Sequence, residues 1–327
     1  MTMTSPVLDV RNLRIEFATR RGPVVAIDDI SFTIGRGEIL GVVGESGAGK
    51  SLTGNAVIGL LQPPGRIAGG SIHLGGERID GLPEASMRQI RGRRVGAIFQ
   101  DPLTSLDPLF TVGSQLVETI LAHLPMSRAD ARARALALLT EVGIPAPEAR
   151  IDQYPHQFSG GMRQRVVIAL ALAAEPELIV ADEPTTALDV SVQAQITALL
   201  KRLCRDHGTG IMLITHDMGV IAETADRVAV LYAGRVVEIG AVEEVLRRPQ
   251  HPYTAALMGS IPSLERRAER LAQIDGAMPR PGRLPPGCAF HPRCTSRGPK
   301  CETSRPELRP TATSVSACWL TQGGTNA

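Results

Sequence analysis

The chain has 327 residues, of which 43% are hydrophobic, 21% charged and 3% aromatic, and its formal net charge is +2. This length suits more than one domain, and this composition is typical of a soluble globular protein. The weak net charge and the scarcity of aromatic residues argue against polyanion binding and base stacking, so we expect no nucleic-acid partner.

Membrane-targeting features are missing from the sequence. Residues 1–6 contain no apolar segment of the kind found in secretory signals. No stretch approaches about 18 uninterrupted apolar residues, the length that a membrane-spanning helix needs. We therefore expect the chain to span no membrane and to reach one only through a partner.

The first part of the chain predicts strands. Apolar and polar residues alternate around Leu13, Ile15 and Phe17, and again around Ile30, Phe32 and Ile34. Gly75 and Gly76 follow another such run and predict a turn. Together these segments predict an antiparallel β layer.

A glycine-rich loop follows the buried strand that is predicted at residues 39–43. The loop has the pattern G-x-x-x-x-G-K-S of the strand–loop–helix phosphate motif. Glycines let backbone N–H groups approach phosphate oxygens, and the next helix points its positive end at them. In this motif Lys50 binds the β- and γ-phosphates and Ser51 ligates Mg²⁺. The candidate nucleotide-binding residues are Gly44, Glu45, Ser46, Gly47, Ala48, Gly49, Lys50 and Ser51.

Helices are predicted from about residue 103 to residue 172. Ser127 is a suitable N-cap for one run whose apolar residues share a face, and Gly143 ends that run. Four arginines precede this region and predict a solvated basic face, with a role facing phospholipids or a partner as the alternative: Arg88, Arg91, Arg93 and Arg94.

Ser159, Gly160 and Gly161 open another apolar helical run, which Pro176 stops. Serine is a good N-cap, and two glycines allow close approach of the backbone, so this helix start can bind an anion. One chain does not need two such sites for one ATP.

The apolar run Leu178 to Ala181 predicts a second buried strand. Asp182 at its end can hold Mg²⁺ directly or through water, and Glu183 is placed to polarise an attacking water. Strand and helix patterns then alternate over residues 173–245, which predicts a parallel sheet.

The phosphate loop, the segment from Ser159 to Met162 and the pair Asp182-Glu183 occur in the order that resembles ABC ATPases, over roughly residues 7–245. The family pattern has Gln where this chain has Met162. The resemblance implies that Ser159, Gly160 and Gly161 reach across a dimer to the γ-phosphate that the other subunit holds.

The resemblance implies further roles. Gln100 is similar to the Q-loop glutamine, which senses Mg²⁺ and water and faces the membrane partner. Asp189 is similar to the D-loop aspartate, and His216 to the switch histidine at the γ-phosphate. Phe17 is the candidate adenine-stacking residue, with an ordinary core role as the alternative.

Four cysteines crowd into the tail with the spacing C-x5-C-x6-C-x16-C: Cys288, Cys294, Cys301 and Cys318. Clustered thiols in a reducing compartment favour a metal over disulfides. Thiolates suit Zn²⁺ or an iron–sulfur cluster, and the wide gaps favour the cluster.

The tail, including His251-Pro252-Tyr253-Thr254, resembles the C-terminal region of the ATP-binding subunits of oligopeptide/dipeptide permeases. That resemblance implies a 4Fe-4S cluster on the four cysteines, with Zn²⁺ or unligated thiols as the alternatives. A role of the tail as a redox or iron sensor stays open.

We expect an α/β fold in two parts. Residues 1–245 form an ABC-type P-loop ATPase core, with a mixed sheet, an antiparallel β layer and a helical subdomain at about 103–172. Residues 246–327 form a small Cys-rich C-terminal domain.

The resemblance implies an ATPase subunit of a peptide importer, peripheral on the cytoplasmic face of the inner membrane. Its implied partners are a second, distinct ATPase subunit, two membrane-spanning permease subunits and, indirectly, an extracytoplasmic peptide-binding protein. Two alternatives stay open: the same machine with nickel, glutathione or oligosaccharide as cargo, and a soluble ABC ATPase.

Overall fold

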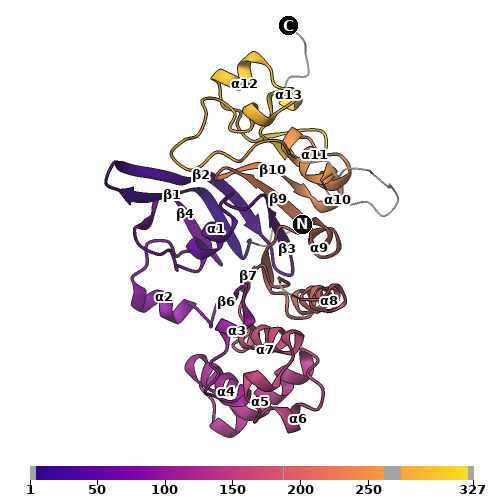
Figure 1. The fold of residues 1–327 in the computed structure, drawn as a ribbon. Helices are drawn as coiled ribbons and strands as arrows, with labels where there is room; N and C mark the ends of the chain where they lie inside the picture. Colours follow the sequence, from indigo (N-terminus) through magenta and orange to yellow (C-terminus); the bar gives the residue numbers. More distant parts are fainter. Residues whose placement is uncertain (1–4, 187, 261–273, 323–327) are drawn as a thin grey trace. The chain divides into compact units, whose positions relative to one another are not determined.

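The computed structural model describes residues 5–186, 188–260 and 274–322 (Figure 1). Its residues fall into two compact units, each assembled from segments that are far apart in sequence. The helical unit takes its described residues from 5–8, 34–39 and 74–213. The phosphate-loop unit takes its described residues from 9–33, 40–73, 214–260 and 274–322.

The helical unit combines a parallel sheet with a group of helices. Its strands are β5 (Glu77–Arg78), β6 (Val95–Ile98), β7 (Leu178–Asp182) and most of β8 (Gly210–Ile214). The order is β8-β7-β6, and β6 pairs with β7 in parallel. The sequence predicts a parallel sheet for residues 173–245, which include β7 and β8, but it does not predict that β6 joins it. Its helical segments are α2 (Glu84–Ile90), α3 (Pro102–Ser105), α4 (Val112–His123), α5 (Arg128–Glu141), α6 (Pro147–Arg150), η1 (Pro155–Gln157), α7 (Gly160–Leu172) and α8 (Val190–His207).

Helices α4, α5 and α7 pack against one another (Figure 1). Leu116, Ile120 and Leu139 are fully buried among them. Burial of each such side chain contributes roughly 1.5–3 kcal/mol. The predicted cap of α5 is confirmed, because Ser127 Oγ accepts a hydrogen bond from the N–H of Asp130 at 3.2 Å.

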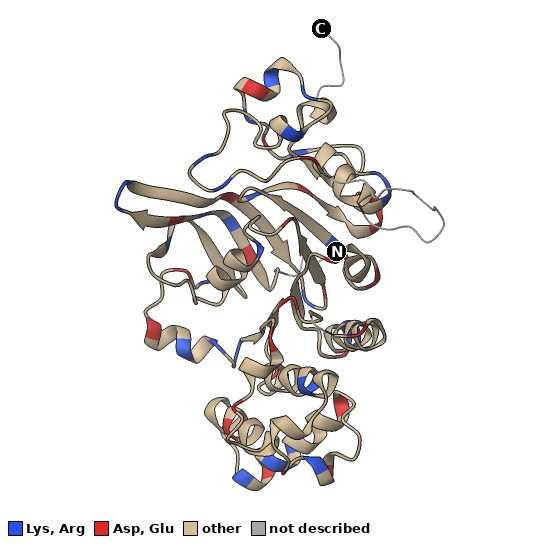
Figure 2. Ribbon diagram, viewed as in Figure 1, with Lys and Arg blue, Asp and Glu red and all other residues tan. Residues whose placement is uncertain are grey.

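The expectation of a solvated basic face is wrong for two of its four arginines. Arg94 donates to the carboxylates of Glu177 at 2.6 Å and Glu77 at 2.5 Å, and Arg91 pairs with Glu84 at 2.5 Å. Figure 2 shows basic and acidic residues interspersed along the helices of this unit. The acidic partners lie far from Arg94 in sequence, so a local charge pattern did not reveal them.

The phosphate-loop unit contains two sets of strands. One set has the order β2-β1-β4 and consists of β1 (Leu8–Thr19), β2 (Gly22–Ile34) and β4 (Gly65–Leu74). The two residues between β1 and β2 make these strands a hairpin, in agreement with the predicted β layer. The other set has the order β11-β12-β10-β9-β3 and consists of β3 (Ile39–Val43), β9 (Arg227–Tyr232), β10 (Arg235–Ala241), β11 (Arg309–Pro310) and β12 (Val315–Ser316).

The C-terminal region shares a sheet with the strand that precedes the phosphate loop. β3 pairs with β9 in parallel, β9 with β10 antiparallel, and β10 with the C-terminal β12 antiparallel. The helical segments of this unit are α1 (Lys50–Val57), α9 (Met218–Thr224), α10 (Val242–Arg247), α11 (Pro252–Gly259), η2 (His291–Arg293), α12 (Pro299–Thr303) and α13 (Trp319–Gln322). The domain boundary at residue 245 stays a prediction.

In the described ranges, we find no helix with the length and apolarity required to cross a bilayer.

A buried polar network holds the start of α11. The fully buried carboxylate of Glu238 accepts from the N–H groups of Gln250 (2.8 Å) and His251 (2.9 Å) and from Ser314 Oγ (2.7 Å). His251 Nδ1 in turn accepts the N–H of Tyr253 at 3.0 Å and caps the helix. This acceptor role requires an unprotonated Nδ1, and burial lowers the pKa of His251 to about 3.

We predict that His251 makes the chain less stable in mild acid. The unfolded imidazole has an ordinary pKa of about 6.5, so between this pH and the folded pKa of about 3 only the unfolded chain binds the proton. Stability is therefore lost as pH falls below about 6.5, by about 2 kcal/mol at pH 5. Urea unfolding at pH 7.5 and pH 5 measures the loss. His251→Asn keeps a capping acceptor without a proton site and should reduce the loss; an equal loss in both proteins contradicts the assignment.

Candidate functional site

The predicted phosphate loop lies between β3 and α1 and depends on its glycines. Gly44, Gly47 and Gly49 have φ of +148°, +81° and +106°, a region that favours glycine. A Cβ on Gly44 would lie 2.2 Å from the carbonyl oxygen of Leu231, and one on Gly49 would lie 2.3 Å from Ile27 Cδ1. The loop is therefore held tightly between β9 and β2, with no room for side chains at these two positions.

The loop and its lysine are arranged for an anion. Lys50 is buried, and its Nζ donates to the carbonyl oxygens of Gly44 at 2.9 Å and Glu45 at 3.2 Å, so its charge lies along the loop. Helix α1 begins here without a side-chain cap, and Ser51 in its first turn is exposed. A buried cation, a helix N-terminus and a glycine backbone fit a polyphosphate.

In the helical unit, the structure brings two predicted site residues together. Gln100 Nε2 donates to Glu183 Oε2 at 3.0 Å, and Thr186 Oγ1 donates to the same oxygen at 2.9 Å. Asp182 is the last residue of β7, and Glu183 directly after it has φ of +48°. A left-handed non-glycine residue costs about 1–3 kcal/mol and is typical of functional sites.

A second group of predicted residues lies on the surface of the helical unit. Ser159 is the exposed N-cap of α7, and its Oγ accepts a backbone N–H of the first turn at 3.4 Å. A Cβ on Gly161 would lie 2.6 Å from Val192 Cγ1, so α7 begins against the start of α8. Asp189 is the exposed N-cap residue of α8. The glycines and Asp189 thus lie at adjoining helix starts that face solvent.

The remaining predicted residues lie in the phosphate-loop unit. His216 is exposed between β8 and α9, next to Asp217, which caps α9 by accepting from the N–H of Gly219 at 2.8 Å. Phe17 is half-buried in β1, and a Cβ on Gly65 of β4 would lie 3.0 Å from its ring. These contacts do not test the expected role of His216 at the γ-phosphate or that of Phe17 at the adenine, so both roles stay predictions.

The four tail cysteines line one cavity of about 10 Å³. All are free thiols, and burial raises the pKa of Cys288 to about 11 and also raises those of Cys294 and Cys318. The donors have the chemistry of a metal site. Across the described residues, however, no three His, Cys, Asp or Glu side chains are grouped to hold a metal ion. The structure therefore supports the gathering of the thiols and gives no support to the 4Fe-4S cluster.

The C-terminal region also contacts the phosphate loop, which the sequence did not reveal. The hydroxyl of Tyr253 accepts the N–H of Glu45 at 2.9 Å, and Arg293 donates to both carboxylate oxygens of Glu45 at 2.8 and 2.9 Å. Met278 Sδ accepts the N–H of Ala233 at 3.4 Å. The only sequence signal was the presence of Tyr253 and Arg293 in two tail segments, His251-Pro252-Tyr253-Thr254 and Pro292-Arg293-Cys294, that resemble the peptide-permease subunits.

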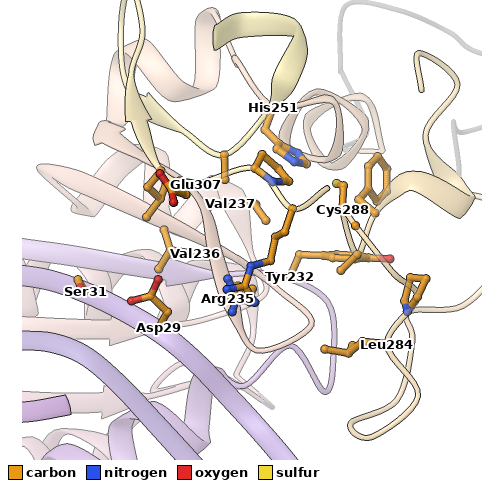
Figure 3. A pocket seen from close by; sticks show the side chains of 18 of the residues that line it. Asp29, Ser31, Tyr232, Arg235, Val236, Val237, His251, Leu284, Cys288 and Glu307 are labelled. Carbon is orange, nitrogen blue, oxygen red and sulfur yellow. The ribbon is translucent and has the colours of Figure 1, made fainter. Parts of the chain in front are cut away.

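A cavity of about 630 Å³ lies between the β9–β10 hairpin and the C-terminal region. Figure 3 shows Tyr232, Arg235 and Cys288 in its wall, together with Asp29 of β2 and Glu307 of the tail. Its wall therefore carries both signs of charge. It also includes Tyr232, whose hydroxyl accepts a hydrogen bond from Arg293.

Comparisons with known proteins agree with this geometry. Residues 27–186 match the family described as ABC transporter, and residues 237–301 match the family described as oligopeptide/dipeptide transporter, C-terminal region. The dipeptide transport ATP-binding protein DppD of Bacillus subtilis is 48% identical over 317 residues, covering 96% of this chain and 94% of the relative. The oligopeptide transport ATP-binding protein OppD of Salmonella typhimurium is 47% identical over 300 residues, covering 92% and 89%.

Among solved structures, a dimeric post-hydrolysis state of the ATP-binding cassette MJ0796 bound to ADP and Pi matches with a TM-score of 0.64 and 29% identity. The match covers 72% of this chain and 98% of that chain. The expected α/β cassette fold is therefore confirmed.

We predict that Gly44→Ala destabilises the chain far more than Gly22→Ala does. Both residues have positive φ, at +148° and +108°, but only a Cβ on Gly44 meets another atom, the Leu231 oxygen, whereas Gly22 has open space. The strain alone costs about 1 kcal/mol, and the added clash raises the cost to at least about 3 kcal/mol. Urea unfolding midpoints of the two variants provide the measurement, and equal midpoints contradict the packing described above.

Proposed function

Because this chain belongs to the family of ATP-binding subunits of oligopeptide/dipeptide ABC transporters, we propose that its ATPase activity energises the import of di- and oligopeptides. The observation that carries this proposal is the extent of the similarity. It runs over nearly the whole chain and includes the C-terminal region that is characteristic of peptide transporters. The chain itself hydrolyses ATP and has no need to contact the peptide.

The phosphate loop holds the nucleotide in this proposal. Lys50 and the N–H groups at the start of α1 bind the phosphates, and the residues from Gly44 to Ser51 surround them. Ser51 and Asp182 ligate Mg²⁺, with Gln100 as a further ligand directly or through water. Phe17 stacks on the adenine. Mg²⁺ held by these residues would supply positive charge that neutralises the phosphates.

Glu183 is the general base that removes a proton from the attacking water. Gln100 and Thr186 both donate to Oε2 of Glu183 and fix the orientation of its carboxylate. His216 contacts the γ-phosphate. The left-handed backbone of Glu183 supports this role, because strain is retained where a side chain must be aimed.

The active assembly in this proposal is a dimer of cassettes. The exposed segment of Ser159, Gly160 and Gly161, with Asp189 close to it, binds the γ-phosphate that the second subunit holds. Support comes from the solvent-facing position of these helix starts and from the dimeric state of the related cassette. The second subunit is a distinct homologous chain.

The membrane partners contact the helical unit near Gln100. A groove of about 420 Å³ there is lined by residues that include Phe99, Thr104 and Leu170. Large apolar side chains are exposed on the same segment of the chain: Phe99, Leu103, Leu109 and Phe110. Such patches are typical of protein interfaces. Two permease subunits dock here at the cytoplasmic face of the inner membrane, and an extracytoplasmic binding protein delivers the peptide to them.

The tail thiols hold a metal group in this proposal, a 4Fe-4S cluster in preference to Zn²⁺. Support comes from the thiolate chemistry of the donors and from the single small cavity that Cys288, Cys294, Cys301 and Cys318 line. A bound cluster supplies cross-links that order a segment with little core of its own. No catalytic step passes through it.

We predict that Glu183→Gln lowers the ATPase rate at least about 100-fold while the protein still binds ATP, because only the general base is removed. A phosphate-release assay and an ATP-binding assay measure the two properties. Glu175→Gln is the matched control, since Glu175 precedes the same strand, also has positive φ and pairs with Arg134 at 3.0 Å.

An amino-acid auxotroph that depends on this transporter for dipeptide uptake should fail to take up the dipeptide when it carries Glu183→Gln. The same strain carrying Glu175→Gln should take it up. Normal uptake with Glu183→Gln contradicts the proposed function. If cells that lack the chain take up peptides normally but lose uptake of nickel, glutathione or oligosaccharide, that substance and not a peptide is the cargo.

We predict about four iron and four acid-labile sulfide per chain, with a visible absorption band, in protein purified without oxygen. The double variant Cys288→Ser, Cys294→Ser should lose both. Cys204→Ala is the control, because Cys204 is buried in α8 and should not affect the metal content. One zinc per chain assigns a structural Zn²⁺ site, and absence of all metal contradicts a metal role.

A further inference from the structure

Arg293 of the C-terminal region uses all five of its N–H donors. Its side chain is 7% exposed. Nε and Nη2 donate to the backbone oxygens of Asp275 (2.9 Å) and Ile274 (3.1 Å), Nη1 donates to the hydroxyl of Tyr232 (3.4 Å), and the two Nη atoms donate to Glu45 Oε2 (2.8 Å) and Oε1 (2.9 Å). A planar guanidinium matches a carboxylate in this bidentate way, which lysine cannot reproduce. These contacts also raise the pKa of Arg293, with the hydrogen bond to Glu45 as the largest cause.

A second contact fixes the backbone of the same loop residue. The hydroxyl of Tyr253 accepts the N–H of Glu45 at 2.9 Å, and burial raises the pKa of Tyr253, so the hydroxyl stays neutral. The ring of Tyr253 packs against those of Tyr232 at 4.6 Å and Phe290 at 5.4 Å between centroids. The acceptor is therefore mounted on a rigid aromatic cluster, and not on a mobile side chain.

The position of Glu45 makes these contacts important. Glu45 is the second residue of the loop that is proposed to hold a triphosphate, and its carboxylate is an anion where the loop must attract anions. An unpaired Glu45 carboxylate would repel phosphates bound in the same loop, and this repulsion is stronger when the charges are less exposed to water. The bidentate pair with Arg293 cancels that charge and turns the carboxylate into an anchor for the loop.

Glu45, Tyr253 and Arg293 are far apart in sequence, and two of them belong to the C-terminal region. We propose that Arg293 and Tyr253 are positioning residues that latch the phosphate loop through Glu45, that Arg293 also neutralises the Glu45 carboxylate, and that this neutralisation has the larger effect on the affinity for ATP. This inference rests on the proposed ATPase function and assigns the C-terminal region a share in nucleotide binding.

The latch is built into the cysteine segment. Arg293 directly precedes Cys294, and the N–H of Cys294 donates to the carbonyl oxygen of His291 at 3.2 Å. Phe290 lines the thiol cavity and also meets the ring of Tyr232 at 5.2 Å. Loss of order around the thiols is therefore transmitted to Glu45 by direct contacts.

The test uses the full chain and a fluorescent ATP analogue whose Kd is measured by titration. Arg293→Gln should weaken binding about tenfold, which corresponds to about 1.4 kcal/mol, because Glu45 keeps its charge and loses its partner. Adding Glu45→Gln to this variant should restore Kd to within about threefold of the wild type. A residue that only supports folding gives no such rescue.

Arg297→Gln is the matched control. Arg297 lies between Cys294 and Cys301 and pairs only loosely with Glu302 of the same segment, at 3.8 Å, so its replacement should leave Kd unchanged. Tyr253→Phe is the milder variant in case Arg293→Gln does not fold. It removes only the acceptor of the Glu45 N–H and should weaken binding about threefold.

Hydrogen–deuterium exchange at the Glu45 amide gives a second readout that does not require ATP. Exchange should accelerate in Arg293→Gln and Tyr253→Phe and not in Arg297→Gln. Unchanged Kd and exchange in both latch variants overturn the proposal, as does a double variant that binds ATP as weakly as Arg293→Gln. If the wild type binds no ATP, the proposed function fails, and the exchange data alone then decide whether the latch exists.

Discussion

The bidentate ion pair between Arg293 and Glu45 joins the C-terminal region to the loop that is proposed to bind ATP. The Arg293 side chain is only 7% exposed, so removing Glu45 would leave a buried cation without its partner. The other donors of Arg293 hold the backbone at Ile274 and Asp275. One side chain therefore couples the order of the C-terminal region to the geometry of the phosphate loop.

The helical unit contains a comparable contact, in which a side chain from a distant segment orients the carboxylate of Glu183, the proposed general base. Gln100 follows the groove-lining Phe99 and donates to Glu183, so one short segment borders both the apolar surface and the proposed base. The proposed permease contact on that surface would therefore act on the segment that orients Glu183. Under the proposed function, this arrangement links the permease contact to Glu183 through one hydrogen bond, without requiring the peptide to approach the nucleotide.

The cysteine segment lies in a part of the chain with few buried apolar side chains. Burial raises the pKa values of Cys288, Cys294 and Cys318, and the four thiols line a cavity of about 10 Å³. Strand β12 and the aromatic cluster of Tyr232, Tyr253 and Phe290 attach this segment to the sheet. The segment is thus fixed to the phosphate-loop unit by its own side chains, and a metal would act on an already attached element.

Local sequence determined the elements and the phosphate loop. Alternation predicted β1 and β2, the cap at Ser127 predicted α5, and the glycine pattern predicted the loop before Lys50, because each depends on neighbours along the chain. The ion pairs of Arg94, the contact of Gln100 with Glu183, and the latch of Arg293 on Glu45 depend on residues brought together from distant segments. Only the tertiary structure decided them, since a side chain's partner across a fold leaves no periodic or positional trace in its own sequence surroundings.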